Sequence, residues 1–166
     1  NLVGIMGGSG AGKSTCLNVL NGNYTPTYGK ITINGIDIHH EKDKIEGVLG
    51  YVAQDDLLIE ELTVFQNLYF AAKFSFAQWP EHKVVEAVER TLSSLSLLEA
   101  KDIIVGSPLR KTISGGQRKR LNIGMELIRQ PSILFVDEPT SGLSSRDSMR
   151  TMELLKDLAL NGKLVF

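Results

Sequence analysis

A glycine-rich run near the start of the chain has the residue types of a phosphate-binding loop. Residues 7–14 read Gly-Gly-Ser-Gly-Ala-Gly-Lys-Ser and fit the pattern G-x-x-x-x-G-K-[ST]. Glycines let the backbone turn successive N–H groups towards one anion, and a helix expected from about Gly12 adds unpaired donors. We expect Lys13 to bind the β- and γ-phosphates of a nucleotide and the Ser14 hydroxyl to bind Mg²⁺.

Two carboxylates follow a short apolar run later in the chain. Ile133–Val136 has the composition of a strand buried on both faces, and Asp137 and Glu138 come directly after it. Ligands of open α/β sheets bind at the carboxyl ends of strands. We therefore expect Asp137 to hold Mg²⁺ beside Ser14, directly or through water, and Glu138 to act as the base that polarises a water molecule. A pair of exposed acids that cap the next turn is the alternative.

A second candidate anion site lies at Ser114-Gly115-Gly116-Gln117, before a helical pattern. Two glycines at a helix N-terminus, preceded by a hydroxyl group, form a cradle for an anion. A plain helix cap with Ser114 as the capping residue is the alternative. Because one triphosphate already occupies residues 7–14, we expect this cradle to bind the γ-phosphate of a nucleotide held by another subunit.

The elements that must position these residues alternate between strands and helices at both ends of the chain. Apolar residues at Leu2, Val3 and Ile5 predict a strand before the phosphate loop, and further strands are expected at 48–53 and from Leu164. The Asn34-Gly35 pair between isoleucines predicts a hairpin. Helices are expected after Gly12, after a capping box at Thr63 and Gln66, after Pro80, over 116–129 and over 145–160. The pattern favours an α/β core with a helical insert.

Composition narrows the possible functions. The 166 residues carry 18 Lys and Arg against 19 Asp and Glu, a net charge of −1, so bulk electrostatic binding of nucleic acid is not expected. Cys16 is the single cysteine, which excludes a disulfide framework, and we expect it to be a buried thiol. The basic run 118–120 is interpreted as a solvated helix face. No apolar run approaches the length of a membrane span, and no signal peptide is visible.

These motifs, in this order, resemble the nucleotide-binding domain of ABC transporters. Gly7–Ser14 resembles the Walker A motif of that family, Leu134–Asp137 its Walker B motif and Glu138 the adjacent glutamate. Ser114–Gln117 resembles the family signature, and Gln54 resembles the Q-loop glutamine. Residues 118–128 and 137–143 are similar to the G, or white, subfamily.

The resemblance implies a fold and a set of roles. It implies a P-loop NTPase (RecA-like) core with an antiparallel β part over 1–54 and 113–166, and a helical subdomain over 55–112. Two copies would dimerise head to tail around two ATP molecules, each between the Walker A loop of one subunit and the signature of the other. Gln54 would contact Mg²⁺ and the attacking water. The nucleotide-binding residues would be Gly7, Gly8, Ser9, Gly10, Ala11, Gly12, Lys13, Ser14 and Thr15 in one copy and Ser114, Gly115, Gly116 and Gln117 in the other.

The resemblance also implies partners and a location. The helical subdomain would press on cytoplasmic loops of a membrane-spanning partner, so the domain would lie at the cytoplasmic face of a membrane. The chain begins and ends within expected strands, which we interpret as a fragment that is weak or inactive alone. The switch histidine and the adenine-stacking aromatic residue of the family would lie outside it, and Ser144 stands where the D-loop usually has Asp.

Other ABC-type ATPases remain as alternatives. Enzymes that maintain DNA place a long coiled coil between the P-loop and the signature, whereas Gln54 and Ser114 are only 60 positions apart (114 − 54) and no heptad run is present. A soluble ATPase that acts on ribosomes also carries these motifs, but the G-subfamily residues count against it. A regulatory module without activity is disfavoured because Lys13, Ser14, Asp137 and Glu138 are intact.

Overall fold

A parallel sheet of three strands lies at the centre of the computed structural model, which describes residues 1–107 and 112–166. The strands are β3 (Leu49–Val52), β4 (Ile133–Val136) and β5 (Leu164–Val165), in the order β3-β4-β5. Leu49 pairs with Ile133, and Ile133 pairs with Leu164, so all three strands end at the same edge. Strand β4 is flanked on both sides, in accord with its unbroken apolar sequence.

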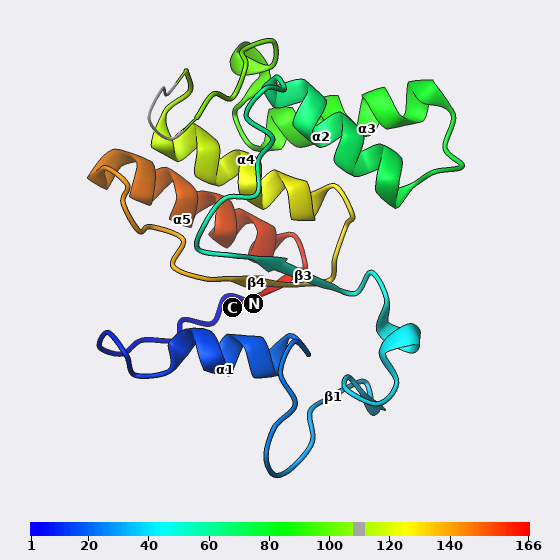
Figure 1. The fold of residues 1–166 in the computed structure, drawn as a ribbon, viewed down its shortest axis with the longest axis vertical. Helices are drawn as coiled ribbons and strands as arrows, with labels where there is room; N and C mark the ends of the chain where they lie inside the picture. The colour runs from blue at the N-terminus through cyan, green and yellow to red at the C-terminus, as the bar shows by residue number, and fades with distance from the viewer. Residues whose placement is uncertain (108–111) are drawn as a thin grey trace.

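Helices cover both faces of this sheet (Figure 1). Helices α4 (Gly115–Leu127) and α5 (Ser145–Leu160) lie on one face, and α1 (Lys13–Leu20) lies on the other. Helix α5 is capped by Ser144, whose hydroxyl oxygen accepts a hydrogen bond from the Asp147 N–H at 3.1 Å. Helix α1 is sparsely packed, and Leu17 is its one buried residue.

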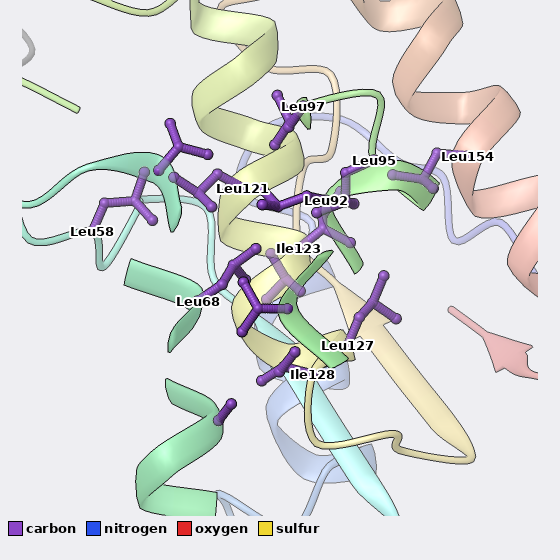
Figure 2. Close-up of a cluster of buried hydrophobic side chains, with 14 of the residues drawn as sticks. Leu58, Leu68, Leu92, Leu95, Leu97, Leu121, Ile123, Leu127, Ile128 and Leu154 are labelled. Atoms are coloured by element: carbon purple, nitrogen blue, oxygen red, sulfur yellow. The ribbon is translucent and has the colours of Figure 1, made fainter. Parts of the chain in front are cut away.

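Two further helices, α2 (Val64–Ser75) and α3 (Glu81–Ser94), pack on the outer side of α4. Helix α2 begins with the predicted capping box, in which Thr63 and Gln66 satisfy each other's backbone N–H groups. One hydrophobic cluster runs from these helices through α4 to the sheet, and Figure 2 shows its leucine and isoleucine side chains around α4. The position of α4 therefore depends on side chains of the sheet, of α5 and of the α2–α3 pair.

Shorter elements connect these layers. The predicted hairpin forms from β1 (Thr32–Ile33) and β2 (Ile36–Asp37), and both turn residues have positive φ, 51° at Asn34 and 84° at Gly35. That geometry is the primed turn that Asn-Gly favours. Two 3-10 helices, η1 (Lys42–Ile45) and η2 (Leu98–Ala100), complete the described elements. The sequence pattern also predicts a loop over residues 106–112, which lies partly outside the described residues. The mixed α/β organisation with an antiparallel part is confirmed.

Two predictions for the N-terminal region were wrong. The strand expected over Leu2, Val3 and Ile5 is reduced to one parallel bridge between Leu2 and Val165, because that segment borders the sheet only at β5. Cys16 is exposed rather than buried, because the sparse packing of α1 leaves that side of the helix uncovered.

The prediction for the basic run was also wrong. Arg118, Lys119 and Arg120 are all buried, with 4–7% of each residue exposed, because α4 is enclosed by the sheet, α5 and the α2–α3 pair. Among residues 1–107 and 112–166, no helix has the length and apolar character needed to cross a bilayer.

A close approach of helices at Gly124 generates the first prediction. A Cβ atom there would lie 2.5 Å from Leu95 Cδ1 and 3.2 Å from Leu68 Cδ2, both in the buried cluster. In Gly124→Ala, the higher helix propensity of alanine would stabilise the fold by about 1 kcal/mol. Overpacking of the core would destabilise it by about 1 to 3 kcal/mol. We expect denaturant unfolding to show a lower free energy of unfolding. Gly4→Ala, where a Cβ meets nothing within 4 Å, should leave it unchanged.

The partly buried carboxyl group of Glu126 on α4 leads to the second prediction. Burial raises the pKa of Glu126 above its usual value of 4.5, although Arg129 and the Tyr51 N–H oppose this effect. The folded state therefore holds this proton more tightly than the unfolded chain, and the stability that it contributes is lost as pH rises through the raised pKa. Glu126→Gln should remove that part of the decline in melting temperature above pH 4.5. Glu86→Gln, on an exposed part of α3, makes the same change in charge and should leave the pH profile as it is.

Candidate functional site

The phosphate loop leads directly into α1. Gly12 is the residue before the helix and has φ 85°, a left-handed conformation that glycine adopts without strain. The Lys13 ammonium folds back over the loop and donates hydrogen bonds to the carbonyl oxygens of Gly7 at 3.1 Å and Gly8 at 3.0 Å. Since the first N–H groups of a helix have no intrahelical acceptor, the exposed N-terminus of α1 offers donors for an anion beside the Lys13 ammonium.

Lys13 shares a pocket of about 380 Å³ with both carboxylates of the acidic pair. Asp137 and Glu138 enter this pocket from the end of β4, and Leu17 of α1 and Leu155 of α5 line it. Asp137 is buried, and its N–H donates to the Val52 carbonyl at 2.9 Å, which continues the ladder between β3 and β4. The structure thus brings Lys13, Asp137 and Glu138 together across the sheet edge.

Glu138 differs from Asp137 in exposure and backbone conformation. It is exposed, and its φ of 43° is left-handed, which is uncommon for a residue other than glycine. The Ser141 N–H donates to its carbonyl oxygen at 3.1 Å and closes a turn. This turn takes the chain away from the strand immediately after Asp137, so the two adjacent carboxylates have different surroundings.

The predicted magnesium ligands are all oxygen donors, as that ion prefers: the Ser14 hydroxyl, the Gln54 amide and the Asp137 carboxylate. Ser14 and Asn18 lie one turn apart on α1, and the Asn18 amide donates to the Ser14 carbonyl at 2.8 Å. Burial and the Asp137 carboxylate raise the pKa of the Tyr51 phenol, and the Asn18 amide opposes them. The residues before and after Ser14 on that face of the helix, Lys13 and Leu17, line the pocket that Asp137 enters, and the oxygens of Ser14 and Asp137 are of the kind that Mg²⁺ takes.

Gln54 is placed differently from the other predicted ligands. Its residue is exposed and lines a smaller pocket of about 190 Å³, together with Gly115 of the signature and residues 141–143. The structure therefore brings Gln54 to the signature helix, while Lys13 and the acidic pair line the other pocket.

The signature residues form the N-terminus of α4. Ser114 and Gln117 make a reciprocal capping box, with the Gln117 N–H on the Ser114 hydroxyl at 3.1 Å and the Ser114 N–H on the Gln117 amide oxygen at 2.8 Å. Ser114 and Gln117 therefore act as a helix cap, as the alternative for this motif predicts. The N–H groups of Gly115 and Gly116 in the first turn remain without intrahelical acceptors.

Gly116, the second glycine of the signature, also packs closely against α5. A Cβ atom on Gly116 would lie 2.2 Å from Asp147 Oδ1. Asp147 belongs to the first turn of α5 and accepts a hydrogen bond from the Ser144 hydroxyl at 2.9 Å. Ser144, at the position where the D-loop usually has Asp, is therefore the cap of α5, and the nearby carboxylate is that of Asp147.

Sequence reasoning missed the buried cations that follow the signature. The Arg118 guanidinium makes two parallel hydrogen bonds to Asp56, at 2.9 and 3.0 Å, and also donates to the carbonyl oxygens of Val105 and Gly106. The Arg120 Nε donates to the Leu95 carbonyl at 3.0 Å, and burial lowers the pKa of its guanidinium although Asp147 opposes this. The signal was available, because three consecutive residues span about 200° of a helix and cannot share one solvated face.

Comparison with known proteins gives the same family as the motifs. The model of the ABC transporter family matches residues 1–141. ABC transporter G family member 18 of Arabidopsis thaliana is 38% identical, over 99% of this chain and 23% of its own length. G family member 28 of the same plant is 42% identical, over 95% of this chain and 14% of its own. G family member STR2 of Medicago truncatula is 36% identical, over 99% of this chain and 22% of its own length.

The chain thus spans less than a quarter of the length of each of these relatives. The phosphate loop, the acidic strand end and the signature helix all lie within residues 1–141, which the family model matches. This chain belongs to the ABC transporter family, has its P-loop NTPase fold and resembles its G, or white, subfamily.

Proposed function

We propose that this chain is the ATP-binding and ATP-hydrolysing domain of a membrane transporter. The observation that carries the proposal is the shared pocket of Lys13, Asp137 and Glu138. In this pocket Lys13 would bind phosphate, Asp137 would bind the metal ion and Glu138 would act as the base. The family assignment supports ATP as the ligand and Mg²⁺ as its ion. The names of the relatives support transport over a soluble function on ribosomes or DNA.

The chain's own residues would divide the work of hydrolysis. The loop from Gly7 to Thr15 would bind and orient the phosphates, and Ser14, Asp137 and Gln54 would hold Mg²⁺, which supplies charge neutralisation when bound. Glu138 would accept a proton from the attacking water. Its exposure in the single chain fits a site that becomes enclosed only when the signature of a second copy, Ser114–Gln117, covers the nucleotide.

The proposed partners are a second copy of the domain and a membrane-spanning domain. The helical subdomain, residues 55–112, would contact the latter at the cytoplasmic face of the membrane. A groove of about 710 Å³ beside α2, β3 and α4 supports this assignment. Both polar and apolar side chains line it, and two of the apolar ones, Phe74 and Leu57, are 87% and 77% exposed. Binding of nucleic acid forms no part of the proposal.

The third prediction tests the phosphate loop. Lys13→Ala in the full-length transporter removes hydrogen bonds between a cation and phosphate oxygens, each worth about 1.5 to 3 kcal/mol, so we expect nucleotide affinity to fall about 100-fold or more. Equilibrium binding of a fluorescent ATP analogue measures this loss. Lys156→Ala, at an exposed position of α5, is the control. Unchanged affinity or hydrolysis in the Lys13 variant would defeat the assignment.

The fourth prediction tests the proposed base. Glu138→Gln keeps the size of the side chain but removes its basicity, so we expect ATP turnover to fall about 10²- to 10⁴-fold while binding is retained. The variant should accumulate as an ATP-bound dimer, measured by size-exclusion chromatography with and without MgATP. Glu86→Gln on α3 serves as the matched control. Normal hydrolysis by the Glu138 variant would show that another group is the base.

A further inference from the structure

One buried ammonium group connects the signature helix to both strand ends of the site. Lys119 lies on α4, five positions after Ser114, and 7% of the residue is exposed. Its Nζ donates to the carbonyl oxygens of Ala53, Gln54 and Asp137, each at 3.3 Å. An ammonium has three N–H donors, and three acceptors from two strand ends surround this one.

The three carbonyl oxygens belong to the peptide units that carry the proposed catalytic side chains. The Ala53 carbonyl precedes Gln54, and the Asp137 carbonyl belongs to the peptide bond between Asp137 and Glu138. A hydrogen bond to a carbonyl restrains the whole planar unit around it. Lys119 therefore restrains the backbone from which the Gln54, Asp137 and Glu138 side chains extend, without contacting the predicted phosphate loop.

Charge also favours an ammonium at this position. Asp137, Asp56, Asp55 and Glu138 all act on the Lys119 ammonium as nearby opposite charges, and they oppose the lowering of its pKa by burial. An apolar side chain of the same length would leave three backbone acceptors in a largely buried place without their donor. It would also remove the cation that attracts the four nearby carboxylates.

The neighbouring residue ties the same helix turn to other segments. Arg118 binds Asp56, just beyond Gln54, and the carbonyl oxygens of residues 105 and 106. The first turns of α4 thus join the signature, the Gln54 segment and the end of β4 into one hydrogen-bonded body. A displacement of the signature would be passed to the Gln54 and Asp137 backbones through Lys119.

We propose that Lys119 is a positioning residue for ATP hydrolysis. Its ammonium holds the backbone at Gln54 and at Asp137–Glu138 in a set relation to the N-terminus of α4, so that the Mg²⁺ ligands and the base are aligned when the signature engages nucleotide on a second copy. This role rests on the proposed ATPase function, which it deepens.

A second lysine, which is partly buried, provides the matched control. The Lys163 Nζ donates to the Pro131 carbonyl at the opposite edge of the sheet, before β4 begins, and burial lowers the pKa of its ammonium as well. Replacing either lysine by Met removes a partly desolvated cation from a carbonyl partner. Only Lys119 is joined to the strand ends that carry the proposed site.

The test compares the full-length transporter with its Lys119→Met and Lys163→Met variants. Four quantities are measured for each: kcat, KM for MgATP, the Mg²⁺ concentration that half-saturates turnover, and the melting temperature. Residues that orient metal ligands typically affect activity or metal affinity about 10- to 100-fold. We expect Lys119→Met to lower kcat by about 10-fold or more and raise the half-saturating Mg²⁺ concentration, with ATP affinity in EDTA within about 2-fold of wild type.

The outcomes separate the possible failures. Lys163→Met should lower the melting temperature and leave kcat and the Mg²⁺ dependence unchanged. If Lys119→Met behaves in the same way, its role is structural and the inference is overturned. If Lys119→Met does not fold, Lys119→Gln, which keeps N–H donors, should fold and still show the changed Mg²⁺ dependence; a wild-type Mg²⁺ dependence there also overturns the inference. A failure of the proposed ATPase function would give a different result. In that case Glu138→Gln would hydrolyse ATP at the same rate as the unsubstituted protein.

Discussion

The burial of α4 between the sheet and the α2–α3 pair is the constraint on which the rest of the structure depends. This helix carries three consecutive cations into the interior, and buried charges are tolerated only where they are paired or hydrogen-bonded. Each cation finds oxygen atoms on a different segment: Arg118 near residues 56 and 105–106, Lys119 at the two strand ends, and Arg120 at the end of α3. Apolar packing alone tolerates small slides of a helix, whereas these directional contacts determine its position.

Local signals in the sequence were sufficient for much of the fold. The Asn34-Gly35 turn and the capping box at Thr63 and Gln66 depend on residues within four positions of one another, and both form as expected. The strand over Ile133–Val136 follows from an unbroken apolar run, and its parallel partners bring their carboxyl ends to one edge. That topological rule is enough to expect an acidic pair near the phosphate loop.

Features that depend on tertiary neighbours could not be inferred in the same way. The apolar residues near Leu2 resemble a strand, but a strand needs partners, and here backbone pairing is available only along β5. Burial of Cys16 was expected from the usual behaviour of thiols, yet it depends on what covers α1. Gln54 lines a pocket with Gly115 of the signature helix rather than the Lys13 pocket, because of the path that the chain takes after β3.

Because of its contact with Asp147, Gly116 is constrained both by packing within the chain and by its place in the proposed nucleotide site. Glycine at this position is needed by the single chain, because the first turn of α5 occupies the space where any side chain would begin. The same position belongs to the proposed nucleotide cradle of a second copy. A substitution there would therefore displace the α5 terminus before any partner is met, and damage to folding and damage to assembly would be inseparable in its phenotype. The packing of the monomer alone therefore disfavours any residue other than glycine at this position.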